Sequence, residues 1–273
     1  MKVHHLNAAS LCPRGARLIH GHGGLLQRAR LVCHVLLAET RDGLALVDTG
    51  LGQGDVADPQ RLNARWVRRV APRLDPAETA IAQVKALGYS PRDVRHILLT
   101  HLDVDHAGGV PDFPEARVHV HLREHEYAMA QAGRQPRYIG AHWRHGPRWQ
   151  FAGAGGEDWF GFKGVRALGE GEPDVLVIPL HGHTPGHCGV AVRGDDGWLL
   201  HAGDSYFFHG EVQTPQRLPP PALAYFQRKG DTDRKARIAN RERLRELHAA
   251  HGREVRMFCA HDPVEYDGSA GFV

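Results

Sequence analysis

Four short apolar runs in this chain each lead into a loop that carries histidine or aspartate. The loops contain His101, His183, Asp204 and His261, and the runs before them occupy residues 94–100, 174–180, 198–201 and 255–259. Runs of this length, bounded by turn residues, are typical of buried β-strands. Because active-site loops commonly follow the carboxyl ends of strands, the pattern predicts an α/β fold with a polar site along its strand ends.

The rest of the chain is expected to belong to the same fold. Buried strands are predicted at residues 31–39, 44–47, 116–121 and 188–192. Helical spacing of apolar residues predicts helices at 59–70, 76–87, 122–131 and 232–251. Two segments lack a clear period and are expected to be irregular excursions that could wall a pocket, near 133–171 and 206–230. No linker-like stretch divides residues 1–273, so we expect a single domain.

Composition argues against several classes of protein. The 273 residues include 34 Lys and Arg and 31 Asp and Glu, and this net charge of +3 gives weak support for nucleic-acid binding. No apolar run approaches the ~20 residues that span a bilayer, and the first residues, MKVHHLNAAS, lack the apolar stretch of a secretory signal. We therefore expect a cytoplasmic protein that acts on a small molecule, without a nucleic-acid or membrane partner.

Histidine is the unusual residue in the composition. The chain has 21 His against nine Phe, which indicates metal or proton chemistry. The four cysteines show no CxxC spacing, so they predict neither a disulfide framework nor a structural zinc site. Four donors, His101, Asp103, Asp105 and His106, fall within six residues. A tight loop with that spacing can direct alternate side chains at two adjacent metal ions, with the other three loops completing the site.

These motifs resemble the ligand motifs of the metallo-β-lactamase superfamily in order and approximate separation. HLDVDH at 101–106, GHTPGH at 182–187, Gly203-Asp204 and His261 carry the resemblance, and LVDTG at 46–50 is similar to the superfamily's early strand and turn. The resemblance covers residues 31–261. It implies a four-layer αββα sandwich with a dinuclear metal site along one edge of its two sheets.

The resemblance also implies a ligand for each metal position. The first ion would be held by His101, Asp103 and His183. The second would be held by Asp105, His106 and His261, with Asp204 bridging the two. The superfamily's usual pattern is HxHxDH, so Asp103 stands where a His is usual. Two zinc ions are the first expectation, but the harder carboxylate ligand could favour iron or manganese at the Asp103 site, or weaken that site.

The implied mechanism uses a hydroxide that bridges two ions about 3.5–4 Å apart and attacks a polarised carbonyl or phosphoryl centre. Asp105 would also orient this hydroxide and accept its proton. In the N-acyl homoserine lactonase branch, a Tyr three residues after the bridging Asp helps to hold the substrate carbonyl. Here that position is Phe207, so Tyr206 is an offset candidate for the role.

A hydrolase of small esters or lactones, similar to the lactonase branch, is the leading expectation. A glyoxalase II-like thioesterase is an alternative, but we find in this sequence no obvious separate C-terminal helical domain that would bind a glutathione conjugate. A phosphodiesterase or nuclease-type hydrolase would call for a more basic surface. A di-iron oxidoreductase is suggested by Asp103, because the flavodiiron branch carries a carboxylate there, but it would need a flavin domain. The oligomeric state is not fixed by the sequence.

Overall fold

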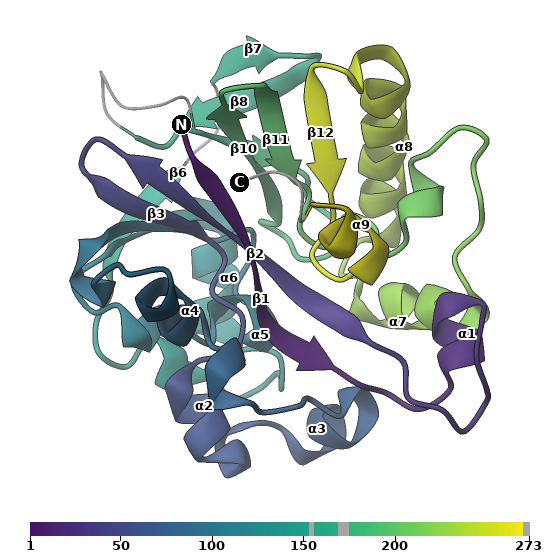
Figure 1. Cartoon of the computed structure of the whole chain (residues 1–273), viewed down its shortest axis with the longest axis horizontal. Helices are drawn as coiled ribbons and strands as arrows, with labels where there is room; N and C mark the ends of the chain where they lie inside the picture. The colour runs from purple at the N-terminus through teal and green to yellow at the C-terminus, as the bar shows by residue number, and fades with distance from the viewer. Residues whose placement is uncertain (153–155, 169–174, 270–273) are drawn as a thin grey trace.

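Two six-stranded mixed β-sheets form the centre of the computed structural model, which describes residues 1–152, 156–168 and 175–269 (Figure 1). The first sheet has the order β1 (Val3–Leu11), β2 (Leu31–Thr40), β3 (Gly43–Val47), β4 (Val94–Leu98), β5 (Arg117–His121) and β6 (Arg148–Ala152). The second has the order β12 (Val255–Phe258), β11 (Gly197–His201), β10 (Cys188–Gly194), β9 (Val175–Pro179), β8 (Phe162–Arg166) and β7 (Glu157–Trp159). Helices cover the outer faces, so the predicted αββα sandwich is confirmed.

Strand direction decides where the loops collect. In the first sheet, β3, β4, β5 and β6 run parallel to one another, while β1 and β2 are antiparallel to their neighbours. In the second sheet, β11 and β12 are parallel, and β9 and β10 form antiparallel pairs with their neighbours. The carboxyl ends of parallel strands meet at one edge, so the loops after β3 and β4 lie together, as do those after β11 and β12.

The central strands β2, β3 and β9 are buried on both faces, which explains why their sequences are apolar without alternation. In β2, Leu36 points into the core between the two sheets, while its neighbour Leu37 points to the outer face. The outer face of the first sheet packs on α4 (Ala80–Ala86) and α6 (Leu122–Gln131). The outer face of the second sheet packs on α8 (Arg234–His251) through Leu244 and Leu247.

The other described α-helices have between four and ten residues. They are α1 (Ala16–His20), α2 (Gln53–Ala57), α3 (Ala64–Val70), α5 (Val104–Ala107), α7 (Pro221–Gly230) and α9 (Pro263–Gly268). Among the described residues, no helix combines the length and the apolar character needed to cross a membrane.

The two segments predicted to be irregular contain regular structure, which corrects that expectation. Residues 133–171 include β6, β7 and β8, and residues 206–230 end in α7. Two of these strands lack the pattern of a buried strand. β6 is an edge strand with three of its five residues exposed, and β7 has only three residues. Residues 153–155, 169–171 and Asp174, at the start of a predicted strand, lie outside the described residues.

Candidate metal centre

The first predicted ligand set comes together at the ends of β4 and β9. Asp103 Oδ2 lies 3.5 Å from His101 Nε2 and 3.3 Å from His183 Nε2. Asp204, in the turn after β11, places its Oδ2 3.3 Å from His183 Nε2. All four side chains are buried. His101 and Asp103 from the loop after β4, and His183 from the loop after β9, therefore lie close enough to share one ion.

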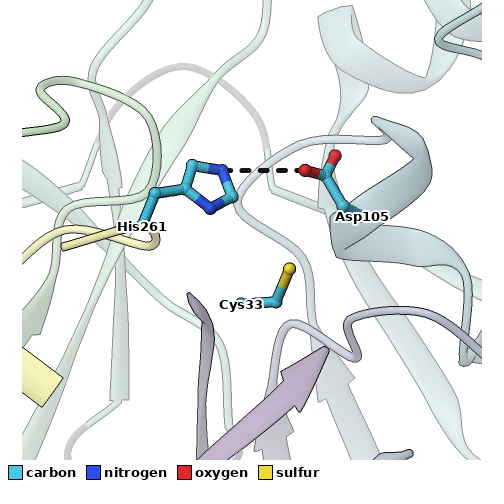
Figure 2. Close-up of side chains that lie close together, drawn as sticks. All are labelled: Cys33, Asp105 and His261. Carbon is cyan, nitrogen blue, oxygen red and sulfur yellow. Dashed lines mark ion pairs between the residues drawn. The ribbon is translucent and has the colours of Figure 1, made fainter. Parts of the chain in front are cut away.

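The second predicted set lies on the other side of Asp204. Asp204 Oδ1 is 3.4 Å from His106 Nε2 and 3.2 Å from His261 Nε2. Asp105 Oδ2 is 3.8 Å from the same nitrogen of His261, and Figure 2 shows the two side chains facing each other. The two oxygens of Asp204 thus face different histidine pairs. This arrangement is the one that a bridging carboxylate would need.

Cys33 is an unexpected neighbour of the second set. It enters from β2, and Figure 2 shows its sulfur beside Asp105 and His261. Ligand atoms of these three residues lie within 4.8 Å of one another. Burial raises the pKa of the Cys33 thiol, although its hydrogen bond to His261 opposes this shift. The sequence did not single out Cys33, because nothing in an apolar strand marks which residue lies beside a polar site.

Unpartnered atoms show that the site suits a cation. Among the described residues, the buried atoms His101 Nε2, His106 Nε2 and Asp204 Oδ1 have no hydrogen-bond partner. A buried polar atom without a partner costs about 1–3 kcal/mol, so native proteins rarely keep several together. Imidazole nitrogens and carboxylate oxygens are the usual donors to zinc and to iron. The residues present therefore fit the divalent ions that the fold implies.

The opposite ring nitrogens of three histidines are held by neighbouring groups. His106 Nδ1 lies 2.8 Å from Asp48 Oδ2, His261 Nδ1 lies 2.7 Å from the Val32 carbonyl oxygen, and His101 Nδ1 lies 2.9 Å from Thr100 Oγ1. An Nδ1–H donated to such a partner leaves Nε2 free to bind a metal. The two partners of His106 and His261 fix this tautomer, since a carboxylate and a carbonyl can only accept.

The carboxylates make the site strongly negative. Burial lowers the pKa of His106, but Asp204 and Asp48 outweigh it and raise that pKa well above its usual value. His261 responds in the same way to Asp204. A site that stabilises imidazolium this strongly is electrostatically suited to divalent cations.

Glu124 joins two of the ligand loops. Its side chain, from α6, is fully buried, and its Oε1 accepts a hydrogen bond from Leu102 N at 3.1 Å. Its Oε2 accepts from Thr184 Oγ1 at 2.5 Å and from Gly186 N at 3.1 Å. Burial raises the pKa of Glu124, although His101 and the hydrogen bonds from Thr184 and Leu102 oppose the shift. The sequence offered no signal for this residue, because its partners lie in other loops.

Arg137 was also missed, and it contacts the first ligand set directly. Its Nε donates to Asp103 Oδ1 at 2.6 Å, and its Nη2 donates to Asp103 Oδ2 at 2.5 Å. Nη2 also lies 2.8 Å from His183 Nε2. Burial raises the pKa of Asp103, but Arg137 outweighs it and holds that pKa well below its usual range. Asp103, which stands where the superfamily usually has a histidine, therefore forms an ion pair with Arg137 from a loop distant in the sequence.

Tyr206 is placed away from the candidate site. Its side chain is fully buried, and its hydroxyl donates a hydrogen bond of 3.0 Å to Glu265 Oε1. The neighbouring Phe207 lines the cavity instead. A buried hydroxyl with a carboxylate partner cannot reach a substrate in that cavity, so Tyr206 is left out of the proposed catalytic set.

A cavity of about 340 Å³ opens onto both ligand sets. Its floor includes Asp103, Asp105, His183, Asp204 and His261. Its walls are mainly apolar and include Leu31, Val70, Phe207, Leu223 and Phe226. Three basic side chains, Arg69, Arg137 and Lys229, also line the cavity. The polar donors thus lie at the base of a small hydrophobic pocket, which is the usual form of a site for a small molecule.

Known proteins resemble this chain in sequence and in structure. A family model for the metallo-beta-lactamase superfamily matches residues 28–250. The probable metallo-hydrolase Rv2300c of Mycobacterium tuberculosis is 40% identical over 274 residues, which cover 97% of this chain and 82% of that protein. The N-acyl homoserine lactonase AttM of Azorhizobium caulinodans is 39% identical over 120 residues, or 42% of each chain.

The fold likeness extends over almost the whole chain. A solved N-acyl homoserine lactone hydrolase, with the product N-hexanoyl-L-homoserine bound at its catalytic metal centre, superposes with a TM-score of 0.72 at 20% identity, covering 98% of this chain and 95% of that one. At this identity the likeness concerns the fold. The matches to the family model and to Rv2300c, which span most of the sequence, show that this chain is a metallo-hydrolase of the metallo-β-lactamase superfamily.

Proposed function

We propose that this protein hydrolyses small esters or lactones with two divalent metal ions. The observation that carries the proposal is the convergence of seven nitrogen and oxygen donors beneath an apolar cavity. The volume of about 340 Å³ is near the lower end of the range for ligand pockets, which favours a small substrate over a polymer.

The proposed ligands divide into the two sets described above. His101, Asp103 and His183 would hold the first ion, His106, Asp105 and His261 the second, and Asp204 would bridge them. Zinc suits the second set, while zinc, iron or manganese suits the first because of Asp103. Divalent ions bound here would supply a hydroxide nucleophile near neutral pH and polarise a carbonyl oxygen.

Other residues of the chain would bind the substrate and move protons. The apolar wall formed by Leu31, Leu223 and Phe226 can hold an acyl chain. Asp105 faces both the cavity and His261, so its carboxylate is placed to accept a proton from the nucleophile. Arg69 and Lys229 can pair with an anionic group on the substrate or the carboxylate product.

The comparisons favour lactones among the possible substrates. AttM is an N-acyl homoserine lactonase, and the solved hydrolase binds an acyl homoserine product at its metal centre. Ring opening of such a lactone gives a carboxylate and an alcohol, and this chain has basic residues beside the donors to receive the carboxylate.

A phosphodiesterase has one observation in its favour. A wider groove of about 1710 Å³ shares Trp66 and Arg69 with the cavity, and it is lined by further arginines, including Arg65, Arg134 and Arg144. These positive side chains would suit a phosphate-bearing substrate. The small inner cavity favours the ester or lactone instead.

One substrate panel tests the proposal. Zinc-loaded protein should open acyl homoserine lactones or cleave aryl esters faster than it cleaves a thioester or an aryl phosphodiester. His106→Ala should abolish this turnover, while His145→Ala, which changes an exposed histidine outside the ligand sets, should leave it intact. Metal-loaded protein that turns over none of the lactones and esters would contradict the proposal.

A further inference from the structure

We propose that Arg137 competes with the first divalent ion, so that the two metal sites fill in a fixed order. The second site, around His106 and His261, would fill first. The first site would fill only when the guanidinium of Arg137 moves away from its partners. This inference rests on the proposed metal-dependent function and adds an ordering of its two ions.

The competition follows from the atoms that Arg137 contacts. Its Nη2 lies 2.5 Å from Asp103 Oδ2 and 2.8 Å from His183 Nε2, and both are proposed donors to the first ion. A neutral imidazole has one acceptor nitrogen, with one lone pair in the ring plane. That lone pair of His183 can accept a hydrogen bond from Arg137 or bind a metal, but it cannot do both. The guanidinium and the first ion are therefore alternatives.

Arg137 is held firmly in this position. Its Nε and Nη2 form a two-point contact with the Asp103 carboxylate, and its Nη1 donates to the Gly230 carbonyl oxygen at 2.8 Å. The ion pair is mostly shielded from water, with side-chain exposures of 17% for Arg137 and 12% for Asp103. Hydrogen bonds between charged groups are about twice as strong as neutral ones, and burial reduces their screening. An incoming ion must compete with these contacts.

The second set has no such competitor. Across residues 1–152, 156–168 and 175–269, no Arg or Lys forms a hydrogen bond or ion pair with His106, His261 or Asp204. The buried atoms His106 Nε2 and Asp204 Oδ1 have no hydrogen-bond partner among the described residues. An ion can bind there without displacing an arginine or lysine side chain, so this site should have the higher affinity.

Asp103 explains why Arg137 can occupy this place. A histidine at the same position would carry no negative charge to form an ion pair with the guanidinium. The carboxylate provides two oxygens in the geometry that arginine recognises. We infer that Asp103 and Arg137 act together, and that the pair lowers the affinity of the first site while leaving its donors in place.

Calorimetric titration of metal-free protein with zinc tests the order in which the two sites fill. The wild-type protein should bind one zinc ion tightly and a second at least tenfold more weakly, a difference of about 1.4 kcal/mol. Arg137→Met should tighten the weak step at least tenfold and leave the tight step within twofold. Arg134→Met, an exposed arginine in the same loop, is the matched control and should change neither step. His183→Ala should remove the weak step alone.

Two further results complete the test. If Arg137→Met folds poorly because Asp103 is left unpaired, the double variant Asp103→His with Arg137→Met restores a neutral donor and should bind two ions with similar affinity. Equal affinities in the wild type, or a weak step that Arg137→Met leaves unchanged or weakens further, would overturn the competition. Wild-type protein that binds no zinc would instead refute the proposed function.

Discussion

Glu124 should be the residue outside the donor set whose loss most disturbs the site. Its carboxylate accepts hydrogen bonds from Leu102, in the first ligand loop, and from Thr184 and Gly186, in the loop after β9. These two loops come from different sheets. Replacing Glu124 with Ala removes the acceptor for three buried donors at once and leaves a cavity between the loops.

The size of the effect follows from those donors. A buried donor without a partner costs about 1–3 kcal/mol, so the two backbone N–H groups of Leu102 and Gly186 together cost about 4 kcal/mol. That is a large part of the 5–15 kcal/mol by which typical domains are stable. Glu124→Gln keeps one acceptor oxygen but turns an NH₂ group toward one donor, so it should cost about 1–2 kcal/mol.

Urea denaturation in the presence of a chelator measures this loss separately from metal binding. Glu126→Ala, an exposed residue on the same helix, is the control and should change the free energy of unfolding by less than about 0.5 kcal/mol. If Glu124→Ala costs no more than this control, the three hydrogen bonds do not hold the loops together, and the reasoning fails.

Three further predictions concern stability and metal affinity. Burial raises the pKa of Glu265 from 4.5 to about 8, so the free energy of unfolding should fall as pH rises through that interval. Glu265→Gln should flatten this pH dependence and be about 3 kcal/mol more stable than the wild type at pH 7. Parallel profiles of unfolding free energy against pH for the two proteins would contradict this prediction. Gly186→Ala would place a Cβ 2.1 Å from a backbone nitrogen of α6, so the midpoint of thermal unfolding should fall by several degrees. Gly140→Ala, at a position with open space around it, should leave the midpoint unchanged. Equal midpoints for the two variants would refute the clash. Asp48→Asn should weaken zinc binding tenfold to a hundredfold by removing the carboxylate that orients His106, and an unchanged affinity in a chelator competition assay would count against that role.

The fold and the convergence of the proposed donors could be predicted because both leave local marks in the sequence. Strands buried on both faces read as continuous apolar runs, as in β3 and β9. The donors carry the chemistry themselves, and four of them share one short motif directly after a strand. The helix predicted at residues 122–131 coincides with α6, because the preceding strand ends at His121 and so marks the position where the helix begins.

Helix boundaries were harder to predict where a capping residue lies inside a stretch of helical apolar spacing. The apolar spacing predicted a helix from residue 76, but the α-helix begins at Ala80, because Thr79 caps it and residues 76–78 form a separate turn. The first strand, β1, was not predicted. The partly exposed edge strand β6 was also missed, because its sequence carries neither a clean alternation nor a buried run.

Residues that act through a partner left no local mark. Arg137 is 34 positions from Asp103, and Glu124 is 60 positions from Thr184. Each looks like an ordinary charged residue in a helix or loop until the fold brings its partner close. Tyr206 shows that a motif position does not fix the direction of a side chain. Adjacent residues in a turn point in different directions, and Phe207, not Tyr206, lines the cavity.

The donors of this site are divided between the two sheets. His101 and His106 follow β4 of the first sheet, whereas His183 and His261 follow strands of the second. An ion bound among them would act as a crosslink between the two halves of the sandwich. Free metal at a hundred times its dissociation constant would add about 2.7 kcal/mol to the folded state. The amount of intact enzyme in a cell would then track the cell's supply of metal as well as its rate of synthesis.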